Sequence, residues 1–343
     1  MDKLSKTINW YLTSPIQQAN GAYLAYYSPF KKGPIYPEIT AYAITVSTIL
    51  YNRQKDNRFL EKARASAAYM NSITQDGAVP SFSDDIFYAF DTGIYISGLL
   101  DLFSVTKEEQ YIENAKESLN WLQHLWEKQP YSASNVVPEK PVWYHRSAIH
   151  LVKLAIPFIK ASICFKDKTY EDKAVKLLDK YKKLQTEHGS FLVEEGSDII
   201  MAHPHSYATE AYLYAYSMLK NEEYYKIAKK ACDWLSLIQN PDGSIYRSYT
   251  ENNDIRETLR TSDATAQSTR LWKLMGQNEN KIEIAYQYLD GISKDGGLRL
   301  IKSNSLTNTI LPPHGPIYSW PTFFYLHSLS IPFGDPTYCK EIF

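Results

Sequence analysis

The sequence predicts an all-α fold, an (α/α)6 toroid in which six inner helices stand inside six outer helices. Three observations support this prediction: two alternating classes of helical segment, a long internal repeat, and an alternation of short and long connections. The 343 residues are 44% hydrophobic and 22% charged, which is typical of a folded chain. We expect residues 1–343 to form one toroid domain.

Six segments are apolar on nearly every side, and each has a Ser or Thr near its start. They are 38–50, 91–103, 147–159, 209–219, 263–274 and 322–329. Their register residues are Thr40, Thr92, Ser147, Thr209, Thr265 and Thr322, which follow one another at intervals of 52, 55, 62, 56 and 57 residues. Helices that are apolar all round are buried, and a regular period indicates a helical repeat. These segments are therefore the predicted inner helices, with the register residues at one end of the ring.

Six other segments are amphipathic, with apolar residues three and four positions apart and charged residues between them. They are 3–12, 57–73, 109–126, 170–185, 222–239 and 279–292. This pattern is typical of a helix that buries one stripe, so these are the predicted outer helices. The segment 3–12 closes the circle against the last inner helix.

The connections from outer to inner helices are long, and several open with a Gly turn. They span 74–90, 127–146, 186–208, 240–262 and 293–321, whereas the inner-to-outer links have only a few residues. Gly turns followed by alternating residues predict small β-hairpins. Long loops gathered at one end of a rigid scaffold are a frequent place for function.

Acids, histidines and aromatic residues cluster where these loops enter the inner helices. Two positions before the register residues stand Glu38, Phe90, His145, Tyr207, Asp263 and Trp320. Their neighbours are Tyr36, Asp91, Tyr144, Arg146, His203, His205 and Glu210, and His314 lies in the last long loop. Aromatic rings pack on sugar rings, and carboxylates divide acid and base work in glycoside hydrolysis.

The first hypothesis is a glycoside hydrolase of acidic oligosaccharides, with Asp91 as general acid and Asp263 or Glu38 as its partner. The second is a uronate epimerase or lyase that uses His145, Tyr144 and His205, with Arg146 against the uronate carboxylate. A glycan-binding toroid without catalysis is the third. Asp91 and Asp263 also fit plain helix capping, because Asp at a helix start accepts unpaired N–H groups.

Net charge, the lengths of apolar runs and the cysteines exclude several classes of protein. The net charge of −1 gives no basic field for nucleic acid, and no run of residues is apolar and long enough for a membrane span. Three distant cysteines indicate neither a disulfide scaffold nor a metal site, and the N-terminal segment lacks the apolar core of a signal peptide. We expect a cytoplasmic protein without a cofactor or metal, whose partner is an oligosaccharide or polysaccharide.

The chain resembles an uncharacterised family of bacterial and archaeal α/α-toroid proteins, often found with surface-polysaccharide genes and labelled as prenyltransferase-like repeats. The matching segments are 36-YPEITAY, 90-FDTGIYISGLL, 111-YIENAKESLNWL, 204-PHSYATEAYLYAY and 262-SDATAQSTRLW. The match departs at Asp263 and in the loop around His314.

More distantly, Asp91-Thr92-Gly93 is similar to the acid-x-Gly motif of unsaturated glucuronyl hydrolases, which implies a catalytic Asp91. A resemblance in architecture to N-acylglucosamine 2-epimerases implies His205 and His314 as a histidine pair.

Overall fold

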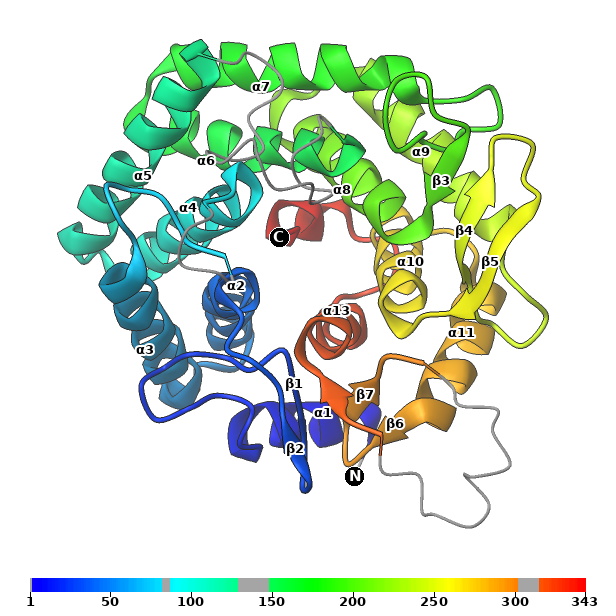
Figure 1. The fold of residues 1–343 in the computed structure, drawn as a ribbon, viewed down its shortest axis with the longest axis horizontal. Helices are drawn as coiled ribbons and strands as arrows, with labels where there is room; N and C mark the ends of the chain where they lie inside the picture. The colour runs from blue at the N-terminus through cyan, green and yellow to red at the C-terminus, as the bar shows by residue number, and fades with distance from the viewer. Residues whose placement is uncertain (1, 82–86, 129–147, 302–314) are drawn as a thin grey trace.

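The computed structural model describes residues 2–81, 87–128, 148–301 and 315–343. It shows the predicted (α/α)6 toroid, with two concentric rings of helices (Figure 1). The inner ring consists of α2 (Pro37–Gln54), α4 (Ala89–Thr106), η2 with α6 (Ile149–Leu154 and Ala155–Phe165), α8 (Ala202–Leu219), α10 (Ser262–Met275) and α13 (Ser319–Ser330). The outer ring consists of α1 (Lys3–Thr13), α3 (Asn57–Ile73), α5 (Glu109–Lys128), α7 (Lys168–Tyr181), α9 (Glu222–Leu237) and α11 (Glu279–Ile292).

Two small antiparallel sheets occupy the long connections, as the Gly turns predicted. One has the strand order β2–β1–β8–β7–β6, and the other β3–β4–β5. The strands are β1 (Tyr26–Ser28), β2 (Lys31–Lys32), β3 (Ile199–Met201), β4 (Tyr246–Thr250), β5 (Ile255–Arg260), β6 (Ser293–Lys294), β7 (Gly297–Arg299) and β8 (Ile317–Tyr318). The first sheet joins the start of the chain to its last long loop, and so ties the two ends of the ring together.

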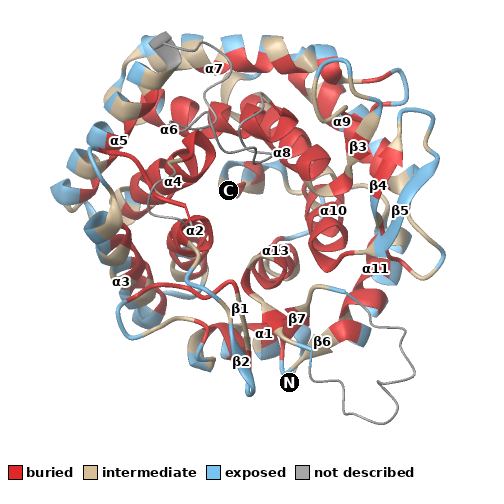
Figure 2. Cartoon of the chain, viewed as in Figure 1, coloured by how far each residue is buried: buried red, intermediate tan, exposed pale blue. Residues whose placement is uncertain are grey.

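The two rings differ in burial as the two sequence classes predicted. Inner helices are buried on nearly every side, whereas outer helices bury one stripe and expose the rest (Figure 2). Short links join each inner helix to the next outer one through a residue in the left-handed conformation. These residues are Lys55, Lys107, Lys166, Lys220 and Gly276. Within the described ranges, no helix is long and apolar enough to span a membrane.

Each described Gly turn that follows an outer helix packs against the next outer helix. Gly243 has a φ of +87°, and a Cβ placed on it would lie 2.3 Å from the carbonyl oxygen of Ile284 in α11. Four other turns repeat this contact: Gly21 on Ala65, Gly77 on Glu117, Gly189 on Lys230 and Gly296 on Lys6. Only glycine adopts this backbone conformation at such a short distance without strain. The last of these contacts, Gly296 on α1, closes the outer ring.

After each turn, the chain forms a second joint with the inner helix that follows. Thr265, the fourth residue of α10, donates a hydrogen bond to the Thr261 carbonyl (3.1 Å) and accepts one from the Ile245 backbone N–H (3.3 Å). The fourth residues of α2, α4 and α13 accept the same kind of bond: Thr40 from Tyr23, Thr92 from Val79 and Thr322 from Leu298. A buried backbone N–H needs such a partner, so the register threonines anchor the loops.

The predicted register is wrong in α8. The fourth residue of this helix is His205, and its Nδ1 accepts the backbone N–H of Phe191 at 3.1 Å. Thr209 therefore lies one turn deeper in the ring than its predicted equivalents. As a consequence His203, and not Tyr207, is equivalent to Glu38 and Asp263. Ser147 lies outside the described residues.

The third inner helix also departs from the prediction of one continuous α-helix. It runs as a 3₁₀ helix over Ile149–Leu154 before the α-helix begins at Ala155. Pro157 explains the change, because it has no N–H to donate to the carbonyl four residues earlier and its ring crowds that carbonyl. Of the cysteines, Cys232 and Cys339 are buried and Cys164 is partly exposed, and all three are free thiols.

We predict that Gly243→Ala lowers the free energy of unfolding by about 1–3 kcal/mol, because the new Cβ meets a main-chain oxygen at a positive φ. The measurement is urea denaturation followed by circular dichroism. Gly291→Ala is the matched control, since a Cβ at Gly291 meets nothing within 4 Å. That control gains helix propensity, so its stability stays level or rises by about 0.5–1 kcal/mol. Equal effects of the two substitutions would contradict the proposed role of the turn.

Candidate functional site

The candidate site lies at the N-terminal end of the inner helices, where the long connections arrive. The second residue of each of five inner helices faces this end: Glu38, Phe90, His203, Asp263 and Trp320. Their positions follow from the repeated joint, because the fourth residue of each helix is fixed to the preceding loop. We call these five residues the rim.

Asp91 and Glu38 form the acidic part of the site. The Asp91 side chain is buried in the first turn of α4, with 2% of its surface exposed, and its Oδ1 has no hydrogen-bond partner among the described residues. Burial raises the pKa of Asp91 well above its usual value, and the negative charge of Glu38 raises it further. The Tyr36 hydroxyl donates to Glu38 Oε2 at 2.7 Å. The two carboxyl groups thus differ in surroundings, since Glu38 accepts a hydrogen bond from Tyr36 whereas burial favours the protonated form of Asp91.

Asp263, Trp320 and His203 form the second part of the site. Asp263 Oδ2 accepts the indole N–H of Trp320 at 3.2 Å and lies 3.9 Å from His203 Nδ1. The His203 ring is 4.4 Å from the ring of Tyr207, and its side chain is 26% exposed. Trp320 also contacts Tyr36 edge-on, with ring centroids 6.4 Å apart. A partly exposed imidazole, a carboxylate and an aromatic surface are therefore adjacent.

Below the rim, the centre of the ring holds a buried cluster of charges. Lys153 Nζ donates to Glu210 Oε2 at 2.7 Å, and Arg270 donates to Glu210 Oε1. Lys153 also lies 4.0 Å from the ring centroid of Tyr207, and Arg270 lies 4.8 Å from that of Phe324. Glu210 is thus a buried ion-pair residue rather than a rim residue.

His205, predicted as catalytic, has both ring nitrogens on the main chain. Its Nδ1 accepts from Phe191 N–H, and its Nε2 donates to the Ala231 carbonyl at 3.1 Å. The ring is fully buried, and this burial lowers its pKa to about 3. We therefore interpret His205 as the neutral anchor of its loop.

Of the other predicted residues, two take part in aromatic packing and four lie outside the described residues. Phe90 and Tyr207 contact each other with ring centroids 5.3 Å apart. His145, Tyr144, Arg146 and His314 lie outside the described residues. Sequence reasoning missed Lys153 and Gln267; the signal for Lys153 was a charged residue inside an apolar helix. In the described ranges, no three His, Cys, Asp or Glu side chains lie close enough to hold a metal ion.

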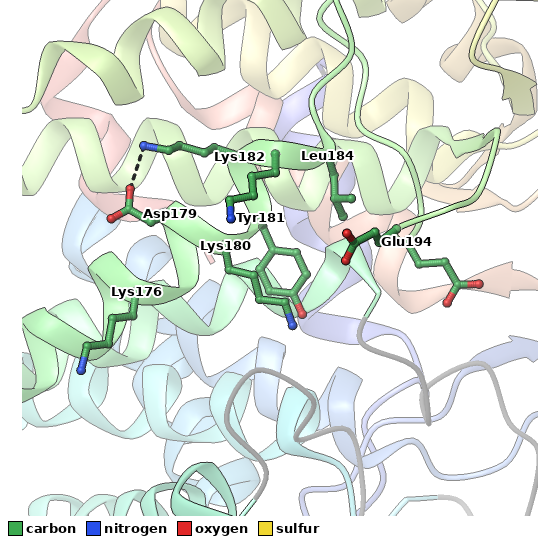
Figure 3. A pocket seen from close by; sticks show the side chains of 9 residues that line it. Lys176, Asp179, Lys180, Tyr181, Lys182, Leu184 and Glu194 are labelled. Atoms are coloured by element: carbon green, nitrogen blue, oxygen red, sulfur yellow. Dashed lines mark ion pairs between the residues drawn. The ribbon is translucent and has the colours of Figure 1, made fainter.

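A hollow of about 730 Å³ lies away from the rim, beside outer helix α7 (Figure 3). Its charged lining consists of Lys176, Asp179, Lys180, Lys182, Lys183, Glu194 and Glu195. Lys182 forms ion pairs with Asp179 at 2.9 Å and with Glu223 at 3.1 Å. Cations and anions therefore largely offset each other in this hollow, and it contains none of the rim residues.

Several solved structures share the fold over almost the whole chain. A D-mannose isomerase has a TM-score of 0.75 at 10% identity, covering 99% of this chain and 96% of that one. A cellobiose 2-epimerase from Bacillus thermoamylovorans has a TM-score of 0.73 at 13% identity, covering 95% and 98%. An unsaturated glucuronyl hydrolase specific for heparin has a TM-score of 0.71 at 13% identity, covering 95% of both chains.

These likenesses confirm, at the level of the fold, the resemblance to glucuronyl hydrolases and sugar epimerases. No family model and no curated protein matches the sequence. At such low identity the comparisons establish the toroid, and the activity has to be argued from the site.

We predict that His205→Gln lowers the free energy of unfolding by about 1–3 kcal/mol at pH 7.5, because two buried main-chain groups lose well-placed partners. The folded pKa of about 3 lies below the unfolded value of about 6.5, so the unfolded state takes up the proton first. The advantage of the wild type is therefore complete above about pH 6.5 and shrinks by about 2 kcal/mol at pH 5.

Urea denaturation at both pH values measures this difference. The control is His188→Gln, which alters an exposed histidine in the connection that His205 anchors and leaves stability at pH 7.5 unchanged. Parallel stability curves for the wild type and His205→Gln would show that His205 is not held neutral.

Proposed function

We propose that the protein is a carbohydrate-active enzyme that hydrolyses a glycosidic bond in a uronate-containing oligosaccharide, with Asp91 as the general acid. The observation that carries the proposal is the buried Asp91 carboxyl group, which has an oxygen without a partner among the described residues and lies near the charge of Glu38. A raised pKa favours the protonated form of such a group, which an acid catalyst requires. The fold shared with a glucuronyl hydrolase supports this choice of reaction.

The geometry supports the following roles for the remaining residues. Asp91 donates its proton to the leaving oxygen as the glycosidic bond breaks, and a water molecule supplies the new C–O bond. The proton of that water passes to the Asp263 and His203 group. Trp320 offers an aromatic surface for a sugar ring, and its N–H keeps the Asp263 carboxylate oriented. Glu38, hydrogen-bonded by Tyr36, maintains the negative charge that keeps Asp91 protonated.

A second candidate is a sugar epimerase or isomerase, and the exposed ring of His203 next to Asp263 favours it. In that reaction His203 removes a proton from carbon, in place of the set of His145, Tyr144 and His205 expected from the sequence. The fold shared with an epimerase and an isomerase is consistent with this candidate.

A panel of acidic oligosaccharides, with saturated and unsaturated uronate ends, distinguishes the candidates by mass spectrometry and NMR. Hydrolysis yields two fragments that together gain one water. An isomerised product of unchanged mass, or a new ultraviolet-absorbing double bond, would replace the hydrolase proposal by the epimerase or the lyase. Binding without any covalent change would indicate a glycan-binding toroid.

We predict that Asp91→Asn lowers the rate of hydrolysis by about 10²–10⁴-fold, because the amide has no proton to donate. The variant folds and is at least as stable as the wild type at pH 7. The sign follows from the raised folded pKa of Asp91: wild-type stability decreases as the pH rises above the unfolded value of about 4, and asparagine lacks this loss.

Steady-state kinetics on the confirmed substrate measure the rate of hydrolysis, and urea denaturation measures the stability. Asp167→Asn is the control, because Asp167 caps outer helix α7 through the Thr169 N–H and asparagine caps almost as well. Full activity of Asp91→Asn would exclude Asp91 as the acid.

A further inference from the structure

A chain of hydrogen bonds connects the rim to the buried charges beneath it. His203 Nδ1 lies 2.6 Å from Gln267 Oε1, and Gln267 Nε2 donates to Glu210 Oε1 at 3.2 Å. Gln267 is fully buried in α10, one turn after Asp263. It is therefore the direct link between the partly exposed His203 ring and the central ion cluster.

The ionisation of Glu210 determines which way the Gln267 amide points. Burial by itself would raise the pKa of Glu210, but the positive charges of Arg270 and Lys153 outweigh it and hold that pKa below its usual value. Burial lowers the pKa of Lys153 to about 8, so it too is charged at pH 7. An ionised carboxylate only accepts hydrogen bonds, so it requires the amide nitrogen of Gln267.

The amide orientation in turn determines the tautomer of His203. With its nitrogen on Glu210, Gln267 presents only its oxygen to Nδ1, and two acceptors cannot share this contact without a proton. Nδ1 therefore carries the proton. Asp263 Oδ2, 3.9 Å from the same nitrogen, is a second acceptor on the same side and favours the same tautomer. In the neutral ring this leaves Nε2 with a free lone pair, and no described residue donates a hydrogen bond to it.

We propose that Gln267 is a positioning residue that holds His203 with its proton on Nδ1, so that His203 Nε2 is the proton acceptor of the site. An isolated imidazole prefers the opposite tautomer, so the buried network reverses the ordinary preference. The acceptor role rests on the proposed function: Nε2 takes the proton of the attacking water while the water oxygen bonds to the sugar carbon and Asp91 protonates the leaving oxygen. The tautomer itself does not depend on any reaction.

NMR of the protein with ¹⁵N-labelled histidine tests the tautomer without a substrate. Two-bond ¹H–¹⁵N correlations distinguish the Nδ1–H form of a neutral imidazole from its Nε2–H form. His203→Gln identifies the His203 signals by their loss. We expect the Nδ1–H form in the wild type and a shift toward the Nε2–H form in Gln267→Leu. An Nε2–H form in the wild type overturns the proposal, and an unchanged tautomer in a folded Gln267→Leu overturns the role of Gln267.

The kinetic test uses the same variant on the confirmed substrate. We expect Gln267→Leu to lower kcat by about 10²-fold with little change in KM. A His203 ring in the wrong tautomer stabilises the transition state less, whereas it hardly affects substrate binding. If Gln267→Leu shifts the tautomer but leaves kcat unchanged, His203 is not the proton acceptor. If no hydrolysis is found for any substrate, the NMR result still decides the tautomer, so the two proposals fail separately.

Discussion

The close approach of each turn glycine to the carbonyl of the next outer helix is the constraint on which the rest of the structure depends. At Gly243 the distance from a virtual Cβ to the Ile284 oxygen is 2.3 Å, and four other turns repeat the contact. It fixes where each long connection begins, so the following backbone N–H meets the fourth residue of the next inner helix. The rim residues stand two positions before these fourth residues, so this joint also determines where they lie. The geometry of the candidate site thus begins with a backbone requirement at the opposite end of each long connection.

The helices of this fold were predictable because each carries its own pattern. All-round apolar segments and one-sided stripes are local features, and the structure confirms both rings. The register error in α8 also has a local cause. His205 and Thr209 are one turn apart in α8, and both side chains carry a hydrogen-bond acceptor. A sequence shows that a loop N–H needs a partner, but not which of two acceptors, one turn apart, it reaches.

The candidate site was predictable only where its residues stand at the starts of inner helices. Glu38, Asp91 and Asp263 were found because each stands at the start of an inner helix, which is visible in sequence. Gln267 and Lys153 were not, because their roles arise from contacts between different helices. The bond from Gln267 to Glu210 joins residues 57 positions apart, and that from Lys153 to Glu210 does the same. Contacts between side chains of different helices at the centre of the ring produce no periodic residue pattern within any one helix.

The contact of Gly296 with Lys6 has a consequence for how the chain folds. It joins residues 290 positions apart, and α1 has no outer-ring neighbour on that side until the last long connection is made. Contacts of such long sequence separation form late, because loop closure must be complete before they contribute. During synthesis, therefore, α1 lacks this contact until the connection that contains Gly296 has been made. The outer ring therefore stays open during synthesis, and it closes only when the Gly296 turn reaches α1.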